Sequence, residues 1–484
     1  MFANKLQVLS EDEIKRIDGA SRALLWEVGT LCHYEEAFDI FENIGCKVDR
    51  FVDEHGKNAA MIYIPDHVVN DMLAKCSPTV YLYNRETGKP VIFGGDNVSF
   101  GSVGVASYAY DIDTDTFRVV TEKDINETTK LCDVLPNLDF LLPHGTPAEL
   151  PPMTADLYEC KAQLLYSSKP FFFEVYSKEN TIKCCDMIFE VSGGQENFVR
   201  KPFAALQITL TSPLHLRDDV CFGLIEGGKR GIGAFIESGP MSCGTGPSTL
   251  AANVALANAE ILGAFILAKA VNPNVPLVYC SWARIIDMKF AACAHGGPEF
   301  SLQRVALSQL GKYYNLPTGG GCMLSDTKAI DVQYGLEKMG NALICALAGV
   351  NMMCGMGQFA DENAISLESY IIDNEIAGWI KRAKKGILVN DDTLDIEIIR
   401  EVGPGGDFLR NKHTYAHYAN EQFIPSILDR GFLAIDKDPE KKLMRKRAKK
   451  YYQKLMQSYV GPQLSEECKQ KIQAIIDADY SDKL

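Results

Sequence analysis

Two apolar segments in the middle of the chain end in side chains that could bind a cation. The run GIGAFIES ends beside Glu237, and the run PLVYCSW contains Tyr279 and ends at Trp282. Aromatic faces near a carboxylate are how proteins bind a quaternary ammonium group, which has no N–H to donate. The alternative is ordinary core packing, because alternate residues of a strand point to opposite faces.

The segment between these two runs indicates how they are held together. A Gly/Ser/Pro loop leads into a long apolar helix candidate, LAANVALANAEILGAFILAKA, which the break VNPN ends. A strand, a helix and a second strand in this order form a βαβ unit with parallel strands. Ligands bind at the carboxyl ends of such strands, and these ends carry the acid and the two aromatic residues.

The same theme of a β-type run, a Gly/Pro loop and a helix candidate occurs eight times. The runs are 98–110, 139–145, 170–176, 203–210, 231–238, 276–282, 314–321 and 350–357. Eight repeats favour an α/β fold of the (β/α)8 TIM barrel type over an open doubly wound sheet. The first run is long and rich in glycine, so it would suit a hairpin equally well.

The regions on either side of the repeats do not follow this pattern of alternating strands and helices. We expect residues 1–97 to form N-terminal helices and a β-hairpin, 98–386 the barrel, and 387–484 a C-terminal helical region. The run SEDE offers a capping box for the first helix, and VYLYNRETGKPVIFGG alternates as a hairpin does. The basic helix candidate PEKKLMRKRAKKYYQKLMQ is either a solvated helix or a docking site for an acidic partner.

Composition limits the classes of partner. The chain has 63 acidic and 49 basic residues, which argues against nucleic-acid binding, since phosphates are bound by clustered Lys and Arg. Fifteen dispersed cysteines are typical of reduced thiols rather than a disulfide framework. The first residues lack the apolar stretch of a signal peptide, and polar residues interrupt the best candidate for a membrane span. We therefore expect a soluble cytoplasmic protein, with a homo-oligomer possible.

Several ligand classes have weak support. Neither a phosphate-binding P-loop nor a dinucleotide-binding glycine motif is present in the sequence. The triplet Gly319–Gly321 could cradle a phosphate, or it could let backbone or any ligand approach closely. His413 and His417 are four residues apart, as metal ligands often are, but neither a Glu base nor a third ligand accompanies them. We expect no metal site.

Other strand ends add candidate residues to the same edge of the sheet. His144 ends the second run, where it could bind substrate or be a buried structural histidine. Phe173, Glu174, Gln207 and, just beyond the eighth run, Phe359 are further candidates. As a set, aromatic residues and carboxylates with few cations suit a cationic ligand that makes few hydrogen bonds.

Longer segments resemble a known family. They are LPNLDFLLPHG, SPLHLRDDV, the helix quoted above with its flanks, GGPEFSLQRVALSQLGKYYNLPTGGG, SDTKAIDVQYGLEKM, ISLESYIIDNEIAGWIKR and GPGGDFLRNKHTYAHYANEQFIPSILDR. Over about residues 20–430 the chain resembles the trimethylamine methyltransferase (MttB) family of corrinoid-dependent methyltransferases. The family fold is a (β/α)8 barrel, which agrees with the eight repeats. The chain lacks the family's pyrrolysine and so resembles its non-pyrrolysine branch, which demethylates quaternary amines such as glycine betaine.

The resemblance implies a mechanism. A small quaternary amine would bind at the barrel mouth, a separate corrinoid protein would dock over it, and its Co(I) would attack one N-methyl carbon in line. The corrinoid would be carried by that partner and not bound tightly to this chain. A neutral tertiary amine would leave, so a general acid is less necessary.

With this mechanism as a hypothesis, we assign roles to the candidate residues. Glu237 would be the catalytic carboxylate that balances the cation, and the cage faces would be Phe173, Tyr279, Trp282 and Phe359. Arg284 would bind a betaine carboxylate through two parallel hydrogen bonds, and His144 and His413 are the next choices. Two other functions stay open. One is a barrel methyltransferase for another methylated amine, a sulfonium or a methoxy donor, and the other is a non-catalytic protein that binds quaternary amines.

Overall fold

A parallel β-sheet lies at the centre of the molecule. The computed structural model describes residues 6–432 and 443–481, and within them this sheet has seven strands in the order β6-β18-β17-β14-β12-β10-β9. The strands are β6 (Ser99–Ser102), β9 (Phe171–Phe173), β10 (Ala204–Leu210), β12 (Gly233–Ser238), β14 (Leu277–Ser281), β17 (Thr318–Gly321) and β18 (Met352–Met356). Each lies within one of the eight predicted runs.

The remaining predicted run, 139–145, forms bridges and no regular strand. Phe140 makes a parallel bridge to Gly101 on β6, and Leu141 makes one to Phe171 on β9. The backbone N–H of Phe172 donates to the carbonyl of Leu141 at 2.8 Å. The run therefore lies between the two edge strands of the sheet. Seven of the eight predicted strands are confirmed as strands. In the remaining run, 139–145, Pro143 has no backbone N–H to donate to a neighbouring strand.

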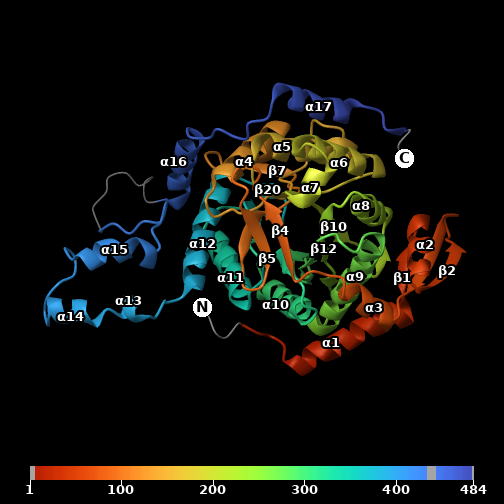
Figure 1. The fold of residues 1–484 in the computed structure, drawn as a ribbon, viewed down its shortest axis with the longest axis horizontal. Helices are drawn as coiled ribbons and strands as arrows, with labels where there is room; N and C mark the ends of the chain where they lie inside the picture. Colours follow the sequence, from red (N-terminus) through yellow and green to blue (C-terminus); the bar gives the residue numbers. More distant parts are fainter. Residues whose placement is uncertain (1–5, 433–442, 482–484) are drawn as a thin grey trace.

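Helices surround the sheet as a ring (Figure 1). One follows each strand and one follows the 139–145 run, as the repeat predicts. The ring helices are α4 (Glu122–Val134), α5 (Ala155–Tyr166), α6 (Lys178–Ser192), α8 (Asp218–Lys229), α9 (Leu250–Val271), α10 (Pro298–Tyr313), α11 (Val332–Ala348) and α12 (Leu367–Lys385). Helix α9 is long and apolar enough to cross a membrane, with a mean hydropathy of 1.7, but 89% of that window is buried. It packs as a core helix.

Side-chain alternation divides the core into two layers. On β14, Val278 and Cys280 belong to a cluster on the inner face of the sheet, whereas Tyr279 belongs to the larger cluster under the helices. On β12, Phe235 faces inward and Ile236 faces the helices. The inner layer is therefore a packed core in its own right, and its residues recur at every second position.

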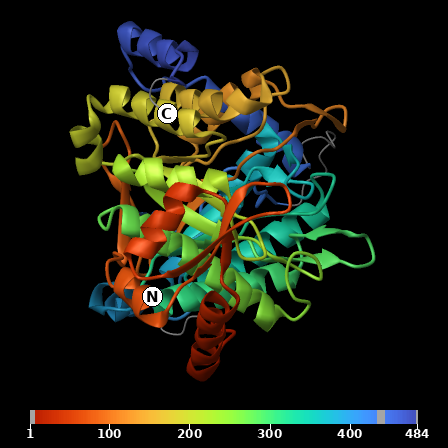
Figure 2. The same ribbon diagram turned by 90° about the vertical axis from the view of Figure 1, so that its right-hand side faces the viewer.

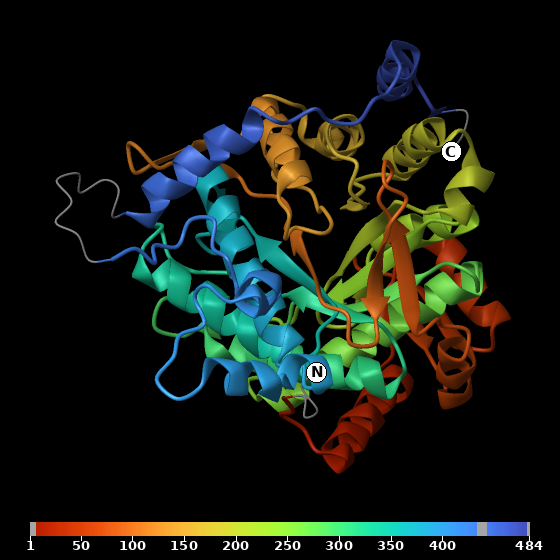
Figure 3. The ribbon, with the colours of Figure 1, turned by 60° about the vertical axis from the view of Figure 1, so that its left-hand side comes forward.

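The N-terminal region contains the predicted helices and hairpin together with strands that were not predicted. Its elements are α1 (Glu11–Ala23), the π-helix η1 (Leu24–Val28), β1 (Thr30–Cys32), α2 (Glu35–Asn43), β2 (Lys47–Val52), β3 (Asn58–Tyr63), α3 (Asp66–Leu73), β4 (Thr79–Tyr83) and β5 (Pro90–Gly94). Ser10 and Glu13 form the predicted capping box. The hairpin β4–β5 crosses the centre of the ring (Figures 1 and 3), where its Phe93 packs against Phe140 and Phe172 of the inner layer. It covers the end of the sheet opposite to the predicted site.

Short strands and turns extend the carboxyl edge of the sheet. One small sheet contains β13 (Met241–Ser242), β15 (Arg284–Asp287) and β16 (Ala292–Ala294). Another contains β7 (Tyr108–Asp111), β8 (Thr116–Val119), β19 (Gln358–Phe359) and β20 (Ala364–Ile365). The other short elements are η2 (Pro152–Thr154), α7 (Gln195–Arg200) and β11 (His215–Leu216), which pairs with β1.

The C-terminal region is helical, as predicted, and lies on the outside of the ring. It contains α13 (Asp391–Leu394), α14 (Ile396–Val402), α15 (Lys412–Glu421), α16 (Met444–Met456) and α17 (Glu466–Asp477). Helix α16 packs on α12 and α4, and α17 packs on α6. Figure 2 shows α17 on the side of the ring opposite to α1. The first residues of the predicted basic helix, 439–442, lie outside the described residues.

Candidate active site

Glu237 lies on the inner face near the carboxyl end of β12. Its neighbour in the sheet register is Thr209 of β10, whose hydroxyl donates to Glu237 Oε1 at 2.7 Å. Gln207 Nε2 lies 3.4 Å from the same oxygen. The other oxygen, Oε2, is buried and has no hydrogen-bond partner within residues 6–432 and 443–481. Glu237 therefore offers one acceptor atom to a ligand.

The surroundings of Glu237 favour its neutral form. Burial raises the pKa of Glu237 to about 8. The hydrogen bond from Thr209 opposes this shift, and the nearby carboxyl groups of Glu174 and Glu362 add to it. A bound cation would reverse the balance, because an opposite charge a few ångströms away favours the carboxylate.

A second, half-buried carboxyl group lies beside a cavity at the same edge. Glu174, which follows β9, lines a cavity of about 240 Å³ together with Gln207 and Thr209. Burial raises the pKa of Glu174 to about 7, and Asp156 and Asp219 add to the effect. The carboxyl ends of β9 and β12 thus bring two acids with raised pKa values close enough for the charge of Glu174 to act on Glu237.

Trp282 supplies an aromatic face to the inner layer. It follows β14, the neighbour of β12 in the sheet, and belongs to the inner cluster. Its indole N–H donates to the carboxylate of Glu362. That hydrogen bond orients the ring. Glu362 is also one of the carboxyl groups whose charge raises the pKa of Glu237.

The glycines of β17 are explained by this packing. A side chain on Gly321 would come within 3.0 Å of the Trp282 ring, and one on Gly320 within 2.1 Å of the Ser281 carbonyl oxygen. Close approach of strand and ring therefore accounts for both residues. Nothing about Gly319–Gly321 requires a phosphate.

Arg284 begins the small strand β15 next to Trp282. Its Nε is buried and lacks a hydrogen-bond partner in the part of the chain that the structure describes. The Nη1 nitrogen lies close to Gly239, where a side chain would be 3.3 Å away. Arg284 is thus a cation with an unused donor at the edge that carries Glu237.

Two predicted cage residues point the other way. Tyr279 lies under the helices, where its hydroxyl donates to Asn258 Oδ1 at 2.7 Å and its ring packs near Phe265. Phe173 belongs to the same outer layer and packs against Phe171. The structure therefore corrects both assignments. The reason is the period of two, since Trp282 and Phe172 occupy the inward positions of the same two segments.

His144 is fully buried beside the ring helices. Its Nδ1 lies 3.0 Å from the hydroxyl of Tyr370 on α12, while Nε2 is without a hydrogen-bond partner among the described residues. Burial lowers the pKa of His144 to about 3. The ring is therefore neutral at physiological pH, as expected for a buried structural histidine, and its role as a donor to a substrate carboxylate stays a prediction.

Phe359 and His413 are also placed apart from Glu237. Phe359 is enclosed by Tyr110 and Tyr334, with ring centroids 5.6 and 5.8 Å away, and belongs to the outer cluster. His413 lies on α15, outside the ring in Figure 1, with His417 and Asp395 near it. Neither residue takes part in a cage around Glu237. Both lie beyond the regular strands, where spacing no longer fixes direction.

Sequence reasoning missed the acidic turn after β18 and the histidine that faces it. His295 Nε2 lies 3.3 Å from Glu362 Oε2, and its Nδ1 lies 2.8 Å from Asp361 Oδ1. The dipeptide Asp361–Glu362 lies four and five residues beyond the end of the eighth predicted run, which was the available signal. His295 has no such signal, because the short strands β15 and β16 separate it from β14.

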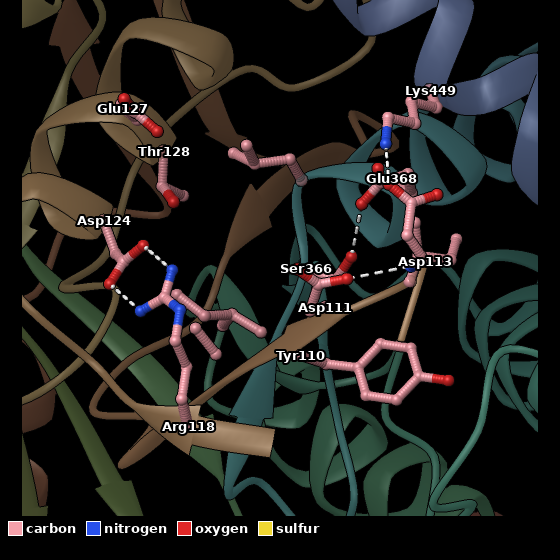
Figure 4. A pocket seen from close by; sticks show the side chains of 14 residues that line it. Tyr110, Asp111, Asp113, Arg118, Asp124, Glu127, Thr128, Ser366, Glu368 and Lys449 are labelled. Carbon is pink, nitrogen blue, oxygen red and sulfur yellow. Dashed lines mark hydrogen bonds and ion pairs between the residues drawn. The ribbon is translucent and has the colours of Figure 1, made fainter. Parts of the chain in front are cut away.

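Another acidic pocket lies on the outer surface, between β7, β8, α4 and α12. Arg118 faces Asp124 through two contacts of 2.6 Å, and Lys449 of α16 reaches Asp113 (Figure 4). Two of its carboxylates, Asp113 and Asp124, therefore have cationic partners from the chain itself. This pocket therefore differs in kind from the edge that carries Glu237.

A profile of the family described as trimethylamine methyltransferase (MTTB) matches residues 2–481. The chain belongs to this family. The match covers nearly the whole sequence, including the N-terminal and C-terminal regions, and confirms the resemblance inferred from the sequence segments. The family assigns the chain to the methyltransferases.

Relatives of this family are similar over most of their length. A glycine betaine methyltransferase of Desulfitobacterium hafniense is 31% identical over 479 residues, which cover 98% of this chain and 97% of the relative. A trimethylamine methyltransferase MttB of the same species is 30% identical and covers 84% of this chain and 81% of its own. An MttB of Methanosarcina barkeri is 31% identical, with 88% and 86% covered.

One solved structure supports the fold of this family member. The Methanosarcina barkeri monomethylamine methyltransferase (MtmB) superimposes with a TM-score of 0.55, at 10% identity, over 95% of this chain and 90% of that chain. At this identity the likeness concerns the fold. It extends over the parallel sheet, its ring of helices and the peripheral regions together.

Proposed function

We propose that this chain transfers a methyl group from a quaternary amine of the betaine type to the cobalt of a corrinoid carried by a separate protein. The family membership supports the reaction class, and the name of the betaine relative supports the substrate class. The observation that carries the proposal is the inner edge of β12 and β14. There a buried acid with one unused oxygen, Glu237, neighbours the inward-facing aromatic residue Trp282.

The sheet is proposed to act as a closed eight-stranded barrel. The bridges of Phe140 and Leu141 support closure, because they join the 139–145 run to both edge strands. Closure would make the carboxyl edge a circular mouth and the hairpin β4–β5 its floor. A mouth with one closed end confines a small ligand to the side where Glu237 and Trp282 lie.

The chain's own residues bind and orient the amine. The Trp282 ring offers its face to the cationic head, and Glu237 balances the charge within a dry inner layer. Arrival of the cation converts Glu237 from its neutral form to a carboxylate, and the released proton goes to solvent. The tertiary amine product is neutral and leaves without a proton. The site therefore needs charge balance more than a general acid.

Arg284 is proposed to bind the carboxylate of a betaine. Its buried Nε has no partner within the described ranges, so a carboxylate would satisfy a donor that the fold leaves unused. Glu237 and Arg284 then hold opposite ends of a zwitterion. This arrangement selects betaines over quaternary amines without a carboxylate.

The mouth must also accept a protein partner. Met288 and Phe290, in the turn between β15 and β16, are 74% and 70% exposed. Exposed apolar residues beside a binding edge suit docking of another protein. The partner's reduced corrinoid supplies the nucleophile for the methyl carbon. This chain supplies orientation and excludes water.

A methyl-transfer assay tests the proposal. The purified chain is mixed with a reduced corrinoid protein and with glycine betaine, longer betaines, choline or trimethylamine, and methylation of cobalt is followed by absorbance. Transfer from betaines is expected. Transfer only from other donors would contradict the substrate class, and tight binding of betaines without transfer would contradict the enzymatic role.

A further inference from the structure

A cluster of possible metal ligands lies at the carboxyl edge, next to the proposed mouth. Cys293 is on β16, His295 follows it by two residues, and Asp361 is in the turn after β19. Their ligand atoms all lie within 4.8 Å of one another. Residues two apart on an extended segment project to the same side, so the local backbone directs Cys293 and His295 toward the turn.

His295 is the buried centre of this cluster. Its side chain is 2% exposed, and neither ring nitrogen has a hydrogen-bond partner in residues 6–432 and 443–481. Asp361 Oδ1, 2.8 Å from Nδ1, is also without one, because the contact lacks hydrogen-bond geometry. Buried polar atoms without partners cost free energy. A cation between the imidazole and the carboxylate would satisfy both.

The backbone holds these groups in place from both sides. The carboxylate of Asp326 accepts the backbone N–H groups of His295 and Gly296 at 2.9 and 2.8 Å. On the other side, Asp361 and Glu362 have φ angles of 57° and 63°, in the left-handed region that non-glycine residues seldom adopt. The tertiary fold thus keeps the acidic turn against β16.

We propose that Cys293, His295 and Asp361 bind a divalent transition-metal ion of borderline softness, such as Zn²⁺. A thiolate and an imidazole favour such an ion, whereas Mg²⁺ and Ca²⁺ require an all-oxygen set. Binding requires the Cys293 thiol to lose its proton to solvent. It also requires Cys293 Sγ to leave its 3.0 Å contact with Met241 Sδ.

Three protein ligands leave one position of a tetrahedral ion for water or for a ligand in the mouth. The site also touches the substrate machinery through Glu362, which lies 3.3 Å from His295 and accepts the indole N–H of Trp282. An ion would fix the turn that orients this ring. The prediction that the chain has no metal site was based on His413 and His417 and did not include Cys293, His295 and Asp361.

Metal binding to the whole chain tests the proposal without any methyl-transfer assay. Protein purified without oxygen is stripped with a chelator, titrated with Zn²⁺ or Co²⁺, and freed of excess ion before elemental analysis. We expect one ion per chain. The Co²⁺ form should show the intense near-ultraviolet absorption of a thiolate bound to cobalt. A stoichiometric Co²⁺ complex without that absorption, or a chain that retains no ion, would overturn the assignment.

Variants locate the ion. Cys293→Ser should abolish the thiolate absorption, and His295→Gln and Asp361→Asn should each weaken Zn²⁺ binding by at least about tenfold, the lower range for support residues of metal sites. Cys243→Ser removes an exposed thiol and serves as the matched control. His413→Gln tests the histidine pair on α15. Loss of the ion in either of these two variants, or its retention with unchanged affinity in the first three, would refute the site.

Discussion

Carboxyl groups occur in two contrasting settings in this molecule. At the inner edge of the sheet, burial raises the pKa of Glu237 to about 8 and that of Glu174 to about 7. In the outer pocket, the hydrogen bond from Lys449 lowers the pKa of Asp113, and Lys446 acts in the same direction. Residue type is similar in the two places. The carboxyl groups of Glu237 and Glu174 are more buried, whereas Asp113 in the outer pocket has lysine side chains of the same chain beside it.

The contrast teaches where a ligand is needed. Two acids of the outer pocket are paired with cations, because α16 brings lysine side chains to Asp113 and β8 brings Arg118 to Asp124. The inner edge has acids without such partners, and its unused atoms include Glu237 Oε2 and Arg284 Nε within the described chain. A zwitterionic ligand would complete it. Function is therefore expected where the fold leaves charges unmatched.

Glu237→Gln should have the largest effect. Removing one member of a buried charge pair costs about 3–5 kcal/mol, so betaine affinity should fall by roughly 100-fold or more. Calorimetric titration measures this change. Glu127→Gln in the outer pocket is the matched control and should bind as the unaltered chain does. Equal affinities for both variants would break the contrast between the two regions.

Trp282→Ala should come next. A desolvated cation–π contact contributes about 2 kcal/mol, which corresponds to roughly a 30-fold loss of affinity. Tyr279→Phe tests the alternation on the same strand, since Tyr279 bonds to Asn258 under the helices. It should lower the free energy of unfolding by about 1 kcal/mol and leave binding unchanged. A binding defect in Tyr279→Phe would place that residue in the site after all.

Arg284→Ala should separate betaines from choline. Loss of a charge-assisted contact of about 1.5–3 kcal/mol predicts a decrease of about tenfold or more for glycine betaine. Choline has no carboxylate, so its affinity should be unaffected. Parallel calorimetric titrations with glycine betaine and with choline measure the two affinities. Similar losses for the two would assign Arg284 a purely structural role.

Affinity for a permanent cation should depend on pH. The pKa of Glu237 is raised to about 8, and the cation binds the deprotonated form. Affinity should therefore increase by roughly tenfold between pH 7 and pH 9, with a proton released on binding near neutral pH. Titrations in buffers of different ionisation enthalpy detect that proton. Glu237→Gln should remove most of the dependence, and a flat profile for the unaltered chain would argue against a neutral Glu237.

Arg118→Gln should have the smallest effect. The ion pair with Asp124 is partly exposed and screened by solvent, so the free energy of unfolding should fall by less than about 1 kcal/mol. Methyl transfer should not change. Chemical denaturation and the transfer assay measure the two quantities. A large loss of activity would show that the outer pocket contributes to function.

The repeat pattern predicted most of the fold, because each apolar run is buried on both faces and each is followed by a helix. It did not show that the 139–145 run forms bridges only, nor that β1, β2 and β3 form a separate sheet. Those outcomes depend on pairing between distant segments. Glu237 and Trp282 were placed on the correct edge by strand ends, but the direction of each side chain depended on register.

The sequence by itself determined the order of strands and helices and the family, and it placed Glu237 and Trp282 at the carboxyl edge of the sheet. Tertiary structure decided which residues face inward. Because Tyr279 and Trp282 are three residues apart, only one of them can face inward, and the packing of Tyr279 under α9 decided that it is Trp282. The tertiary structure also brings His295 next to Asp361, although more than sixty residues separate them in the sequence. Local sequence patterns fix the periodicity of each strand and helix. Only the packing of distant elements determines which charged groups meet and which stay without a partner.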